Sequence, residues 1–250
     1  MTKNIEYLSS SFNPFKARAD WDMLLVVDAC RFDVFQEVNS LPGVLKKWRS
    51  SCSCTQDFVS LFDGLDLRDM VCLSANPHIS NFYLKKLSSG VPFYSVRDVW
   101  DWGWDKKLGT VRPDVVTQAV IEQSIAMSDK KFYVHYLQPH HPFIGKFKIR
   151  EKGVCADSLG IPAKHGRENL STVYDLLKEG KISKESVFRA YKDNLKLVLK
   201  SIEKLRRPGV RIVITSDHGD CFGEKGIFAH PCKSKEPLLT DVPWFEVEII

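Results

Sequence analysis

The stretch RIVITSDHGDCFGEKGIFAHP, residues 211 to 231, decides which fold we expect. Its β-branched run from Ile212 to Ile214 is typical of a parallel strand that is covered on both faces. Asp217 and His218 follow the end of this strand, and in open α/β sheets ligands bind beyond the carboxyl ends of the strands. His230 lies further along and can return to the same place. We therefore interpret the stretch as one strand of an α/β sheet that carries part of a binding site.

The tripeptide Asp-His-Gly also has a purely structural interpretation. An aspartate at the end of a strand can cap a following helix, and Gly219 can complete a turn without any ligand. The tripeptide alone does not decide between the two interpretations, so the rest of the chain has to.

The length and composition are those of a soluble globular protein. With 250 residues, 44% of them hydrophobic and 27% charged, the chain can bury a substantial core as one α/β domain or as two small ones. We predict a single domain over residues 1–250, because the motifs described below run through nearly the whole chain. The net charge of +5 is spread along the sequence, which argues against a nucleic-acid-binding face and favours an anionic small-molecule substrate.

No segment approaches the roughly 20 apolar residues of a membrane span, and the N-terminus has no apolar stretch of signal-peptide length. We therefore expect a cytoplasmic protein without a membrane span, and the sequence leaves its oligomeric state open. The seven cysteines are odd in number and scattered along the chain. Such a pattern fits reduced thiols better than a disulfide framework.

The pattern of apolar residues predicts strands that alternate with helices. The expected strands are residues 23–27, 69–74, 93–96, 131–137 and 211–216, and the expected helices are residues 32–38, 113–128, 169–179 and 184–205. Ile125 is expected on the apolar face of the helix at 113–128. The alternating residues near the C-terminus predict an edge strand or a closing segment. Together these elements predict an α/β fold with a mostly parallel central sheet flanked by helices on both faces.

Polar residues collect at the ends of the predicted strands. Asp28 follows the first strand as Asp217 follows the later one, and a loop of small residues leads to Thr55. Carboxylates and imidazoles from separated strands are what a divalent metal ion needs as ligands. The histidines that can join them are His135, His140, His141 and His230.

A hydroxyl group beside such a metal ion would be easier to deprotonate. The positive charge stabilises the alkoxide and so turns a serine or threonine into a nucleophile near neutral pH. Arg31 lies three residues after Asp28 and can hold an anionic substrate through its forked donors. A long polar loop over residues 145–168 is expected to select the substrate.

The sequence resembles the alkaline phosphatase superfamily and, within it, the sulfatase-like proteins, above all small members of archaeal type. The resemblance runs in the order of that family through nearly the whole chain. Its main stretches are LLVVDACRFDVF (24–35), SCSCTQDF (51–58), LSANPH (73–78), HYLQPHHPFIG (135–145) and VITSDHGDCFGEKGIFAHP (213–231).

The resemblance implies a metal-dependent hydrolase or transferase that acts on phosphate or sulfate esters. Thr55 matches the catalytic nucleophile, and the substrate would be a small-molecule or glycan-linked anionic ester. Zinc, manganese or calcium would occupy one or two sites. The metal ligands implied are Asp28, Thr55, Asp217, His218 and His230, and the substrate-binding residues predicted are Arg31, His135 and His140.

The sequence also departs from the sulfatase pattern. Residues 54–58, CTQDF, lack the proline and arginine of the Cys-x-Pro-x-Arg motif, and Ala29 replaces the second aspartate that sulfatases place beside the first. A spacing of ten residues back from Gly64, used by some relatives, points to Cys54 instead of Thr55 as the nucleophile. These departures leave an alternative open, in which a catalytically silent member of the fold acts as a binding or assembly protein.

Overall fold

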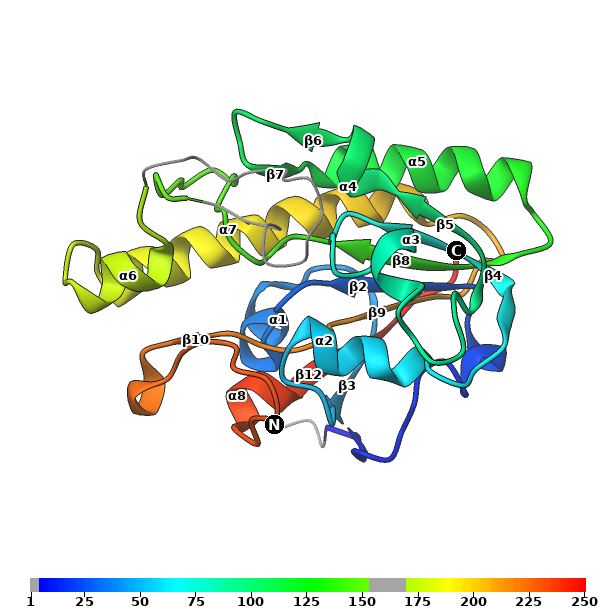
Figure 1. Ribbon diagram of the computed structural model, residues 1–250, viewed down its shortest axis with the longest axis horizontal. Coiled ribbons are helices and arrows are strands. Elements are labelled where there is room, and N and C mark those ends of the chain that lie inside the picture. Colours follow the sequence, from blue (N-terminus) through cyan, green and yellow to red (C-terminus); the bar gives the residue numbers. More distant parts are fainter. Residues whose placement is uncertain (1–4, 153–169) are drawn as a thin grey trace.

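The computed structural model describes residues 5–152 and 170–250, and it consists of one large sheet with helices on both sides (Figure 1). Within the described residues the sheet has eight strands in the order β1-β3-β12-β9-β2-β8-β4-β5. All neighbouring strands are parallel except at β12, which is antiparallel to both β3 and β9. The strands are β1 (Tyr7–Leu8), β2 (Met23–Val27), β3 (Gly43–Arg49), β4 (Leu67–Ser74), β5 (Phe93–Asp98), β8 (Lys131–Tyr136), β9 (Ile212–Thr215) and β12 (Asp241–Val247).

Helices and two small hairpins complete the described part of the chain. The hairpins are β6 (Trp104–Asp105) with β7 (Thr110–Val111) and β10 (Cys221–Phe222) with β11 (Phe228–Ala229). No helix among the described residues is long and apolar enough to cross a membrane. The helices are α1 (Phe32–Val38), α2 (Thr55–Val59), α3 (Asn81–Leu84), α4 (Val99–Trp102), α5 (Pro113–Ala126), α6 (Val173–Lys178), α7 (Lys184–Ile202) and α8 (Pro237–Thr240).

The residues of β2 show why helices cover both faces of the sheet. Met23, Leu25 and Val27 belong to one hydrophobic cluster, in which α1, α5 and α7 also take part. Leu24 and Val26 point to the other face and belong to a second cluster, to which α2 contributes. Successive side chains of a strand alternate between faces, so a strand that is apolar throughout must be buried on both. The predicted α/β fold with a mostly parallel sheet is therefore confirmed.

Three features of the sheet and helices differ from the predictions. Of the two alternatives for the C-terminal residues, the edge strand is wrong, because β12 pairs with β3 on one side and with β9 on the other. β3 was not predicted, since three of its seven residues are charged and only Trp48 among them is fully buried. On α5, Ile125 is 72% exposed and does not belong to the buried face.

The expectation that all cysteines are reduced is also wrong. Cys54 and Cys232 form a disulfide bond although 178 residues separate them. The bond forms because the start of α2 and the loop after β11 meet in the fold, which the spacing of cysteines in the sequence does not reveal. The free cysteines of the described part are Cys30, Cys52, Cys72 and Cys221, all buried. Cys155 and most of the loop at 145–168 lie outside the described residues.

Candidate active site

Polar side chains meet at the carboxyl ends of four neighbouring parallel strands. Asp28 follows β2, Asp217 and His218 follow β9, and Asn76 follows β4, while His135 lies near the end of β8. These strands are adjacent in the sheet, in the order β9-β2-β8-β4. Parallel strands end at the same edge of a sheet, so residues far apart in sequence converge there. The sequence analysis expected this convergence for Asp28, Asp217 and His218.

Thr55 joins this group from the start of α2. It is the first residue of the helix, and Cys54 is the N-cap, whose Sγ accepts a hydrogen bond from the backbone N–H of Asp57. The Thr55 hydroxyl donates to Oδ2 of Asp217 at 2.8 Å, and its oxygen lies 3.4 Å from Nε2 of His218. The side chain is 6% exposed. A nucleophile candidate and two metal-ligand candidates thus share one buried place.

Two buried carboxylates and an imidazole lie close enough to hold one cation. Ligand atoms of Asp28, His135 and Asp217 all lie within 4.8 Å of one another. Nε2 of His135 is 3.4 Å from Oδ2 of Asp28 and 3.6 Å from Oδ2 of Asp217. Oδ1 of Asp28 and Nε2 of His135 are buried without a hydrogen-bond partner. Buried polar atoms are normally satisfied, so these two atoms fit a ligand shell for a metal ion.

The hydrogen bonds of His218 leave one ring nitrogen available for a cation. Its Nδ1 lies 2.7 Å from the backbone oxygen of Gly219, and because a carbonyl can only accept, Nδ1 carries the proton. Nε2 therefore has a free lone pair, and it lies 3.4 Å from Oδ2 of Asp217 and 3.7 Å from Oδ1 of Asp28. A histidine that donates through one nitrogen and binds through the other is the usual metal ligand.

Asp28 stays ionised although it is fully buried. Burial opposes its negative charge, but the hydrogen-bonding imidazole of His135, together with the neighbouring His140 and His218, outweighs that effect and holds its pKa below the usual range. The amide of Asn76 also donates to Oδ2 of Asp28 at 2.6 Å. An ionised carboxylate is the form that binds a cation.

A second group of polar residues lies beside the first. The ring of His230 is 4.3 Å from the ring of His218 and 5.2 Å from that of His140, measured between centroids. Nδ1 of His230 lies 3.5 Å from Oδ1 of Asp220, and the Tyr174 hydroxyl donates to Oδ2 of the same carboxylate at 2.6 Å. His230 and His140 are thus brought to the site, but neither belongs to the cluster of Asp28, His135 and Asp217. Their roles as metal ligand and substrate ligand stay predictions.

The pKa values of His140 and His230 are shifted in opposite directions. Burial, followed by the neighbouring His141, lowers the pKa of His140 to about 4. Burial also opposes the charge on His230, but the hydrogen-bonded Asp220 outweighs it and raises the pKa of His230. Of the two, His230 is therefore the one that more readily carries a proton.

His141 has a structural partner of its own. Its Nδ1 lies 2.7 Å from Oε2 of the buried Glu151, and this carboxylate raises its pKa against the effect of burial. The backbone oxygen of His141 lies 2.6 Å from Nδ1 of His140, so Nδ1 of His140 is protonated and its Nε2 keeps a lone pair. The pair of His141 and Glu151 thus supports His140.

Arg31 is near the site but already has partners. Its guanidinium donates to Asp33 at 2.6 Å and to Glu224 at 2.8 Å, and it lies over the ring of Phe188. Arg31 is 5% exposed. Its predicted role in binding an anionic substrate would require it to exchange these carboxylates for the substrate, and that role stays a prediction.

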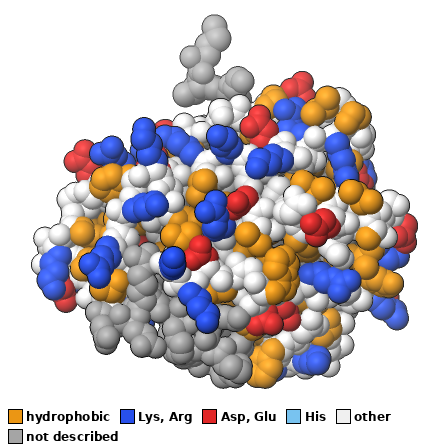
Figure 2. All heavy atoms as spheres, turned by 90° about the horizontal axis from the view of Figure 1, so that it is seen from above, with side chains coloured by type: hydrophobic (Ala, Val, Ile, Leu, Met, Phe, Trp, Pro, Cys, Tyr) orange, Lys and Arg blue, Asp and Glu red, His pale blue; other side chains and the backbone are white. Residues whose placement is uncertain are grey.

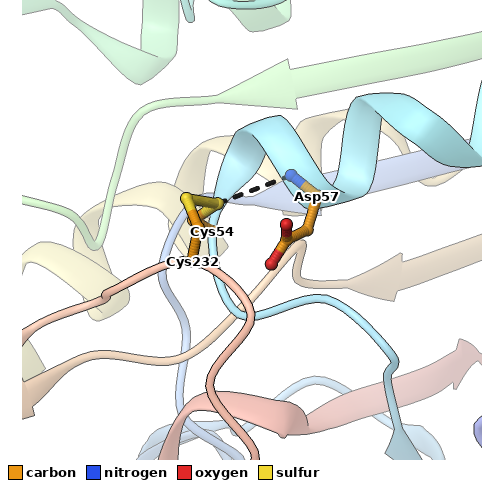
Figure 3. A group of neighbouring side chains, drawn as sticks. All are labelled: Cys54, Asp57 and Cys232. Atoms are coloured by element: carbon orange, nitrogen blue, oxygen red, sulfur yellow. Dashed lines mark hydrogen bonds between the residues drawn. A yellow bond between two sulfur atoms is a disulfide. The ribbon is translucent and has the colours of Figure 1, made fainter.

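Cys54, Asp57 and Cys232 form another group with ligand atoms close together (Figure 3). The two sulfur atoms are bonded to each other, so they are not available as thiolate ligands. The same bond leaves Cys54 without the free thiol that a nucleophile needs. In the oxidised protein the geometry therefore favours Thr55 over Cys54.

No family model and no curated protein matches the chain. Solved structures do match it. The soluble domain of lipooligosaccharide phosphoethanolamine transferase A from Neisseria meningitidis aligns with a TM-score of 0.57 at 12% identity, over 97% of this chain and 76% of that chain. The C-terminal periplasmic domain of phosphoethanolamine transferase EptC from Campylobacter jejuni aligns with a TM-score of 0.53 at 13% identity, over 97% and 79%. The corresponding domain of EptC from Escherichia coli, in complex with Zn, gives 0.50 at 11% identity, over 91% and 72%.

The chain has the alkaline phosphatase-like fold. These neighbours confirm the fold that the resemblance implies. At such low identity they establish the fold alone, and a fold by itself does not carry an activity. They do not bear on the narrower resemblance to archaeal-type members, which stays a prediction.

Several residues of the site were not predicted in a functional role. Asn76 follows β4 as Asp28 follows β2, and this shared position was the available signal. His78 is partly buried beside Asn76, and burial lowers its pKa to about 4. Tyr133 and Tyr174 gave no signal, because a tyrosine in an apolar strand or helix is indistinguishable from a core residue.

Proposed function

We propose that the protein is a metal-dependent enzyme that transfers or hydrolyses phosphate esters, with Thr55 as its nucleophile. The observation that carries the proposal is the contact of the buried Thr55 hydroxyl with Asp217, beside Asp28, His135 and His218. The fold shared with two phosphoethanolamine transferases supports phosphoryl chemistry. The similarity to these transferases favours phosphate esters over sulfate esters as substrates. The absence of a Cys-x-Pro-x-Arg motif from the sequence favours the same choice.

Asp28, Asp217, His218 and Thr55 would hold the metal ion, and His135 lies within reach of the same carboxylates. The donors are two carboxylates, an imidazole and a hydroxyl, which suit zinc or manganese better than calcium. When bound, the ion lowers the pKa of the Thr55 hydroxyl and screens the negative charge of the substrate.

Thr55 and His230 have different roles in the proposed reaction. The Thr55 oxygen, whose proton would pass to solvent when the metal ion binds, forms a bond to phosphorus while the bond from phosphorus to the leaving oxygen breaks, which leaves a phosphothreonine. His230, whose pKa Asp220 raises, supplies the proton that the leaving oxygen needs. Water or an acceptor alcohol then attacks phosphorus, returns a proton to His230 and releases Thr55. Burial of the group keeps bulk water away from the reacting oxygen.

The test is a panel of p-nitrophenyl phosphate mono- and diesters and aryl sulfates, assayed with zinc, manganese or calcium. We expect metal-dependent turnover of a phosphate ester, and an added mass on Thr55 in the trapped intermediate. The matched control for Thr55→Ala is Ser60→Ala, which removes an exposed hydroxyl five residues along the same segment. Ser60→Ala should keep full activity.

Two results would contradict the proposal. Full activity of Thr55→Ala would rule out the nucleophile, and a label on Cys54 would move it by one residue. A protein that binds a metal ion but turns over none of the esters would favour the alternative of a catalytically silent binding protein.

A further inference from the structure

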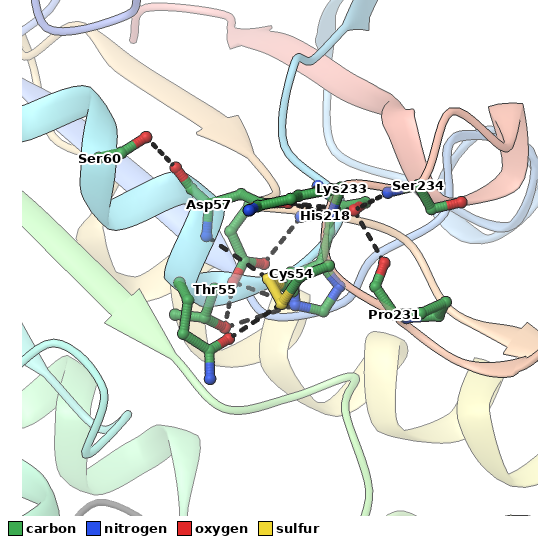
Figure 4. The surroundings of a disulfide bond; sticks show 12 residues. Cys54, Thr55, Asp57, Ser60, His218, Pro231, Lys233 and Ser234 are labelled. Atoms are coloured by element: carbon green, nitrogen blue, oxygen red, sulfur yellow. Dashed lines mark hydrogen bonds and ion pairs between the residues drawn. A yellow bond between two sulfur atoms is a disulfide. The ribbon is translucent and has the colours of Figure 1, made fainter.

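The loop after β11 is bonded to the start of α2. Cys232 lies two residues after His230, and its sulfur is joined to Cys54, the N-cap of the helix that begins with Thr55 (Figure 4). One covalent bond therefore connects the segment that carries His230 to the residue next to the proposed nucleophile.

Three hydrogen bonds also hold this loop to the start of α2, two of them partly buried and one exposed. Ser53 donates through its hydroxyl to the backbone oxygen of Pro231 at 2.9 Å and accepts from the backbone N–H of Ser234 at 2.9 Å. The backbone N–H of Lys233 donates to Oδ2 of Asp57 at 2.9 Å. Each such bond replaces one to water, so its net contribution is modest. The disulfide is the one restraint of the loop that water cannot replace.

The backbone of the loop depends on such restraints. Ala229 has a φ of +62° and Lys233 a φ of +60°. Residues with a Cβ atom rarely adopt this left-handed region, because Cβ crowds the following carbonyl oxygen. The local backbone preferences of residues 229–233 therefore do not favour this conformation, and contacts with α2 must maintain it.

The residue that this loop positions lies at the outer side of the site. The side chain of His230 is 25% exposed, whereas Asp28, His218 and Asp217 are almost completely buried. Its ring packs against His218, and its Nδ1 faces Asp220. A shift of the loop would therefore move His230 and leave the buried ligands in place.

We propose that the Cys54–Cys232 disulfide positions His230 over the active site and makes the activity sensitive to thiol reductants. This inference rests on the proposed function, since it concerns the same site. A dithiol supplies two electrons and two protons; the S–S bond breaks, Cys54 and Cys232 become thiols, and the dithiol closes to its own disulfide. Cys232 is exposed, so a small dithiol can reach it.

The first measurement is kcat/KM for the phosphate ester before and after reduction, with the metal ion in excess throughout. We expect a fall of roughly ten- to a hundredfold, because small misplacement of a reacting group has effects of this size. Reoxidation should restore the activity. The variant Cys232→Ser should be as slow as the reduced protein and should not respond to the dithiol. Lys235→Ser, an exposed change in the same loop that keeps the bridge, should behave like the wild type.

The second measurement is hydrogen exchange over residues 228–236, which does not require activity. Exchange should be faster after reduction and equally fast in Cys232→Ser in both states. Full activity of a protein whose two additional thiols have been titrated would overturn the inference, as would a response of Cys232→Ser to the dithiol. If no ester is turned over even by the oxidised protein, the proposed function fails, while unchanged exchange on reduction would separately refute the role of the bridge.

Discussion

Charged side chains are exposed and paired at the amino ends of β2, β8 and β9, but buried and incompletely paired at the carboxyl ends of the same strands. At the amino ends of β2, β8 and β9, Asp22, Lys131 and Arg211 pair with one another, with Arg211 2.8 Å and Lys131 3.5 Å from Oδ1 of Asp22. These side chains are 24–42% exposed. Asp22 balances one of the two positive charges, and water solvates the other.

At the carboxyl ends of those strands, Asp28, His135 and Asp217 are buried. Among the described residues, no lysine or arginine pairs with the carboxylate of Asp28 or Asp217. Burying a charge without a partner is costly, so a protein keeps such a group where a ligand completes it. Charge alone therefore does not mark a functional site. A charged group that is buried and incompletely paired marks a binding site, whereas an exposed and paired group contributes to stability.

The largest effect is expected from a neutral substitution at the buried end. Asp217→Asn keeps the shape of the side chain but removes its negative charge. That charge lies on the carboxylate that accepts the hydrogen bond of Thr55 and faces Nε2 of His218. We expect phosphate-ester turnover to fall by roughly a thousandfold or more, together with loss of tight metal binding. Steady-state kinetics and metal titration check this. The matched change at the amino end, Asp22→Asn, should leave turnover and metal binding unchanged. Equal losses of activity in the two variants would contradict the assignment of the site to the carboxyl ends of the strands.

Metal binding should stabilise the wild-type protein measurably. At a free metal concentration about 100 times Kd, the gain is about 2.7 kcal/mol, and it should raise Tm by several degrees for a chain of this size. Removal of the ion with a chelator should reverse the shift in a thermal melt. Asp28→Asn should melt at the same temperature with and without the metal ion. A metal-dependent shift in that variant would place the cation elsewhere.

A smaller effect is expected from Tyr133→Phe. The Tyr133 hydroxyl lies 2.8 Å from Nδ1 of the buried His135 and so fixes the orientation of that ring. Its loss should weaken metal affinity by about tenfold, as the loss of a hydrogen bond to a ligand ring usually does. The control is Tyr136→Phe on the same strand, whose hydroxyl contacts Thr117 instead. If both variants bind metal equally well, His135 is not held for a cation.

The smallest effect is expected at the exposed end. The side-chain hydrogen bond from Arg211 lowers the pKa of Asp22 to about 2 from its ordinary 3.8. A lowered folded-state pKa gives stability that is present above pH 3.8 and is lost as the pH falls toward 2. Solvent screening limits the gain, so Asp22→Asn should cost less than about 1 kcal/mol at neutral pH. Denaturant unfolding at several pH values should show the difference from wild type vanish in acid. A difference that is undiminished at pH 2 would contradict the ion-pair explanation.

The sequence by itself determined the elements whose pattern is local. β2 has the predicted bounds and α1 begins where it was predicted, because an apolar β-branched run and a following amphipathic segment need no distant partner to be recognised. The same local logic put Asp28, Asp217 and His218 at strand ends, and parallel strands then place such residues at one edge of the sheet. That much of the site followed from the positions of the strands.

Only the tertiary structure decided which distant residues touch. The place of β12 between β3 and β9, the bond between Cys54 and Cys232, and the contact of Tyr133 with His135 each join positions that no local pattern links. The physical reason is that periodicity in a sequence reports which side of an element is apolar, whereas a contact depends on how whole elements pack. Asp28 can be found in the sequence, but only the folded protein shows that its Oδ1 is buried without a hydrogen-bond partner.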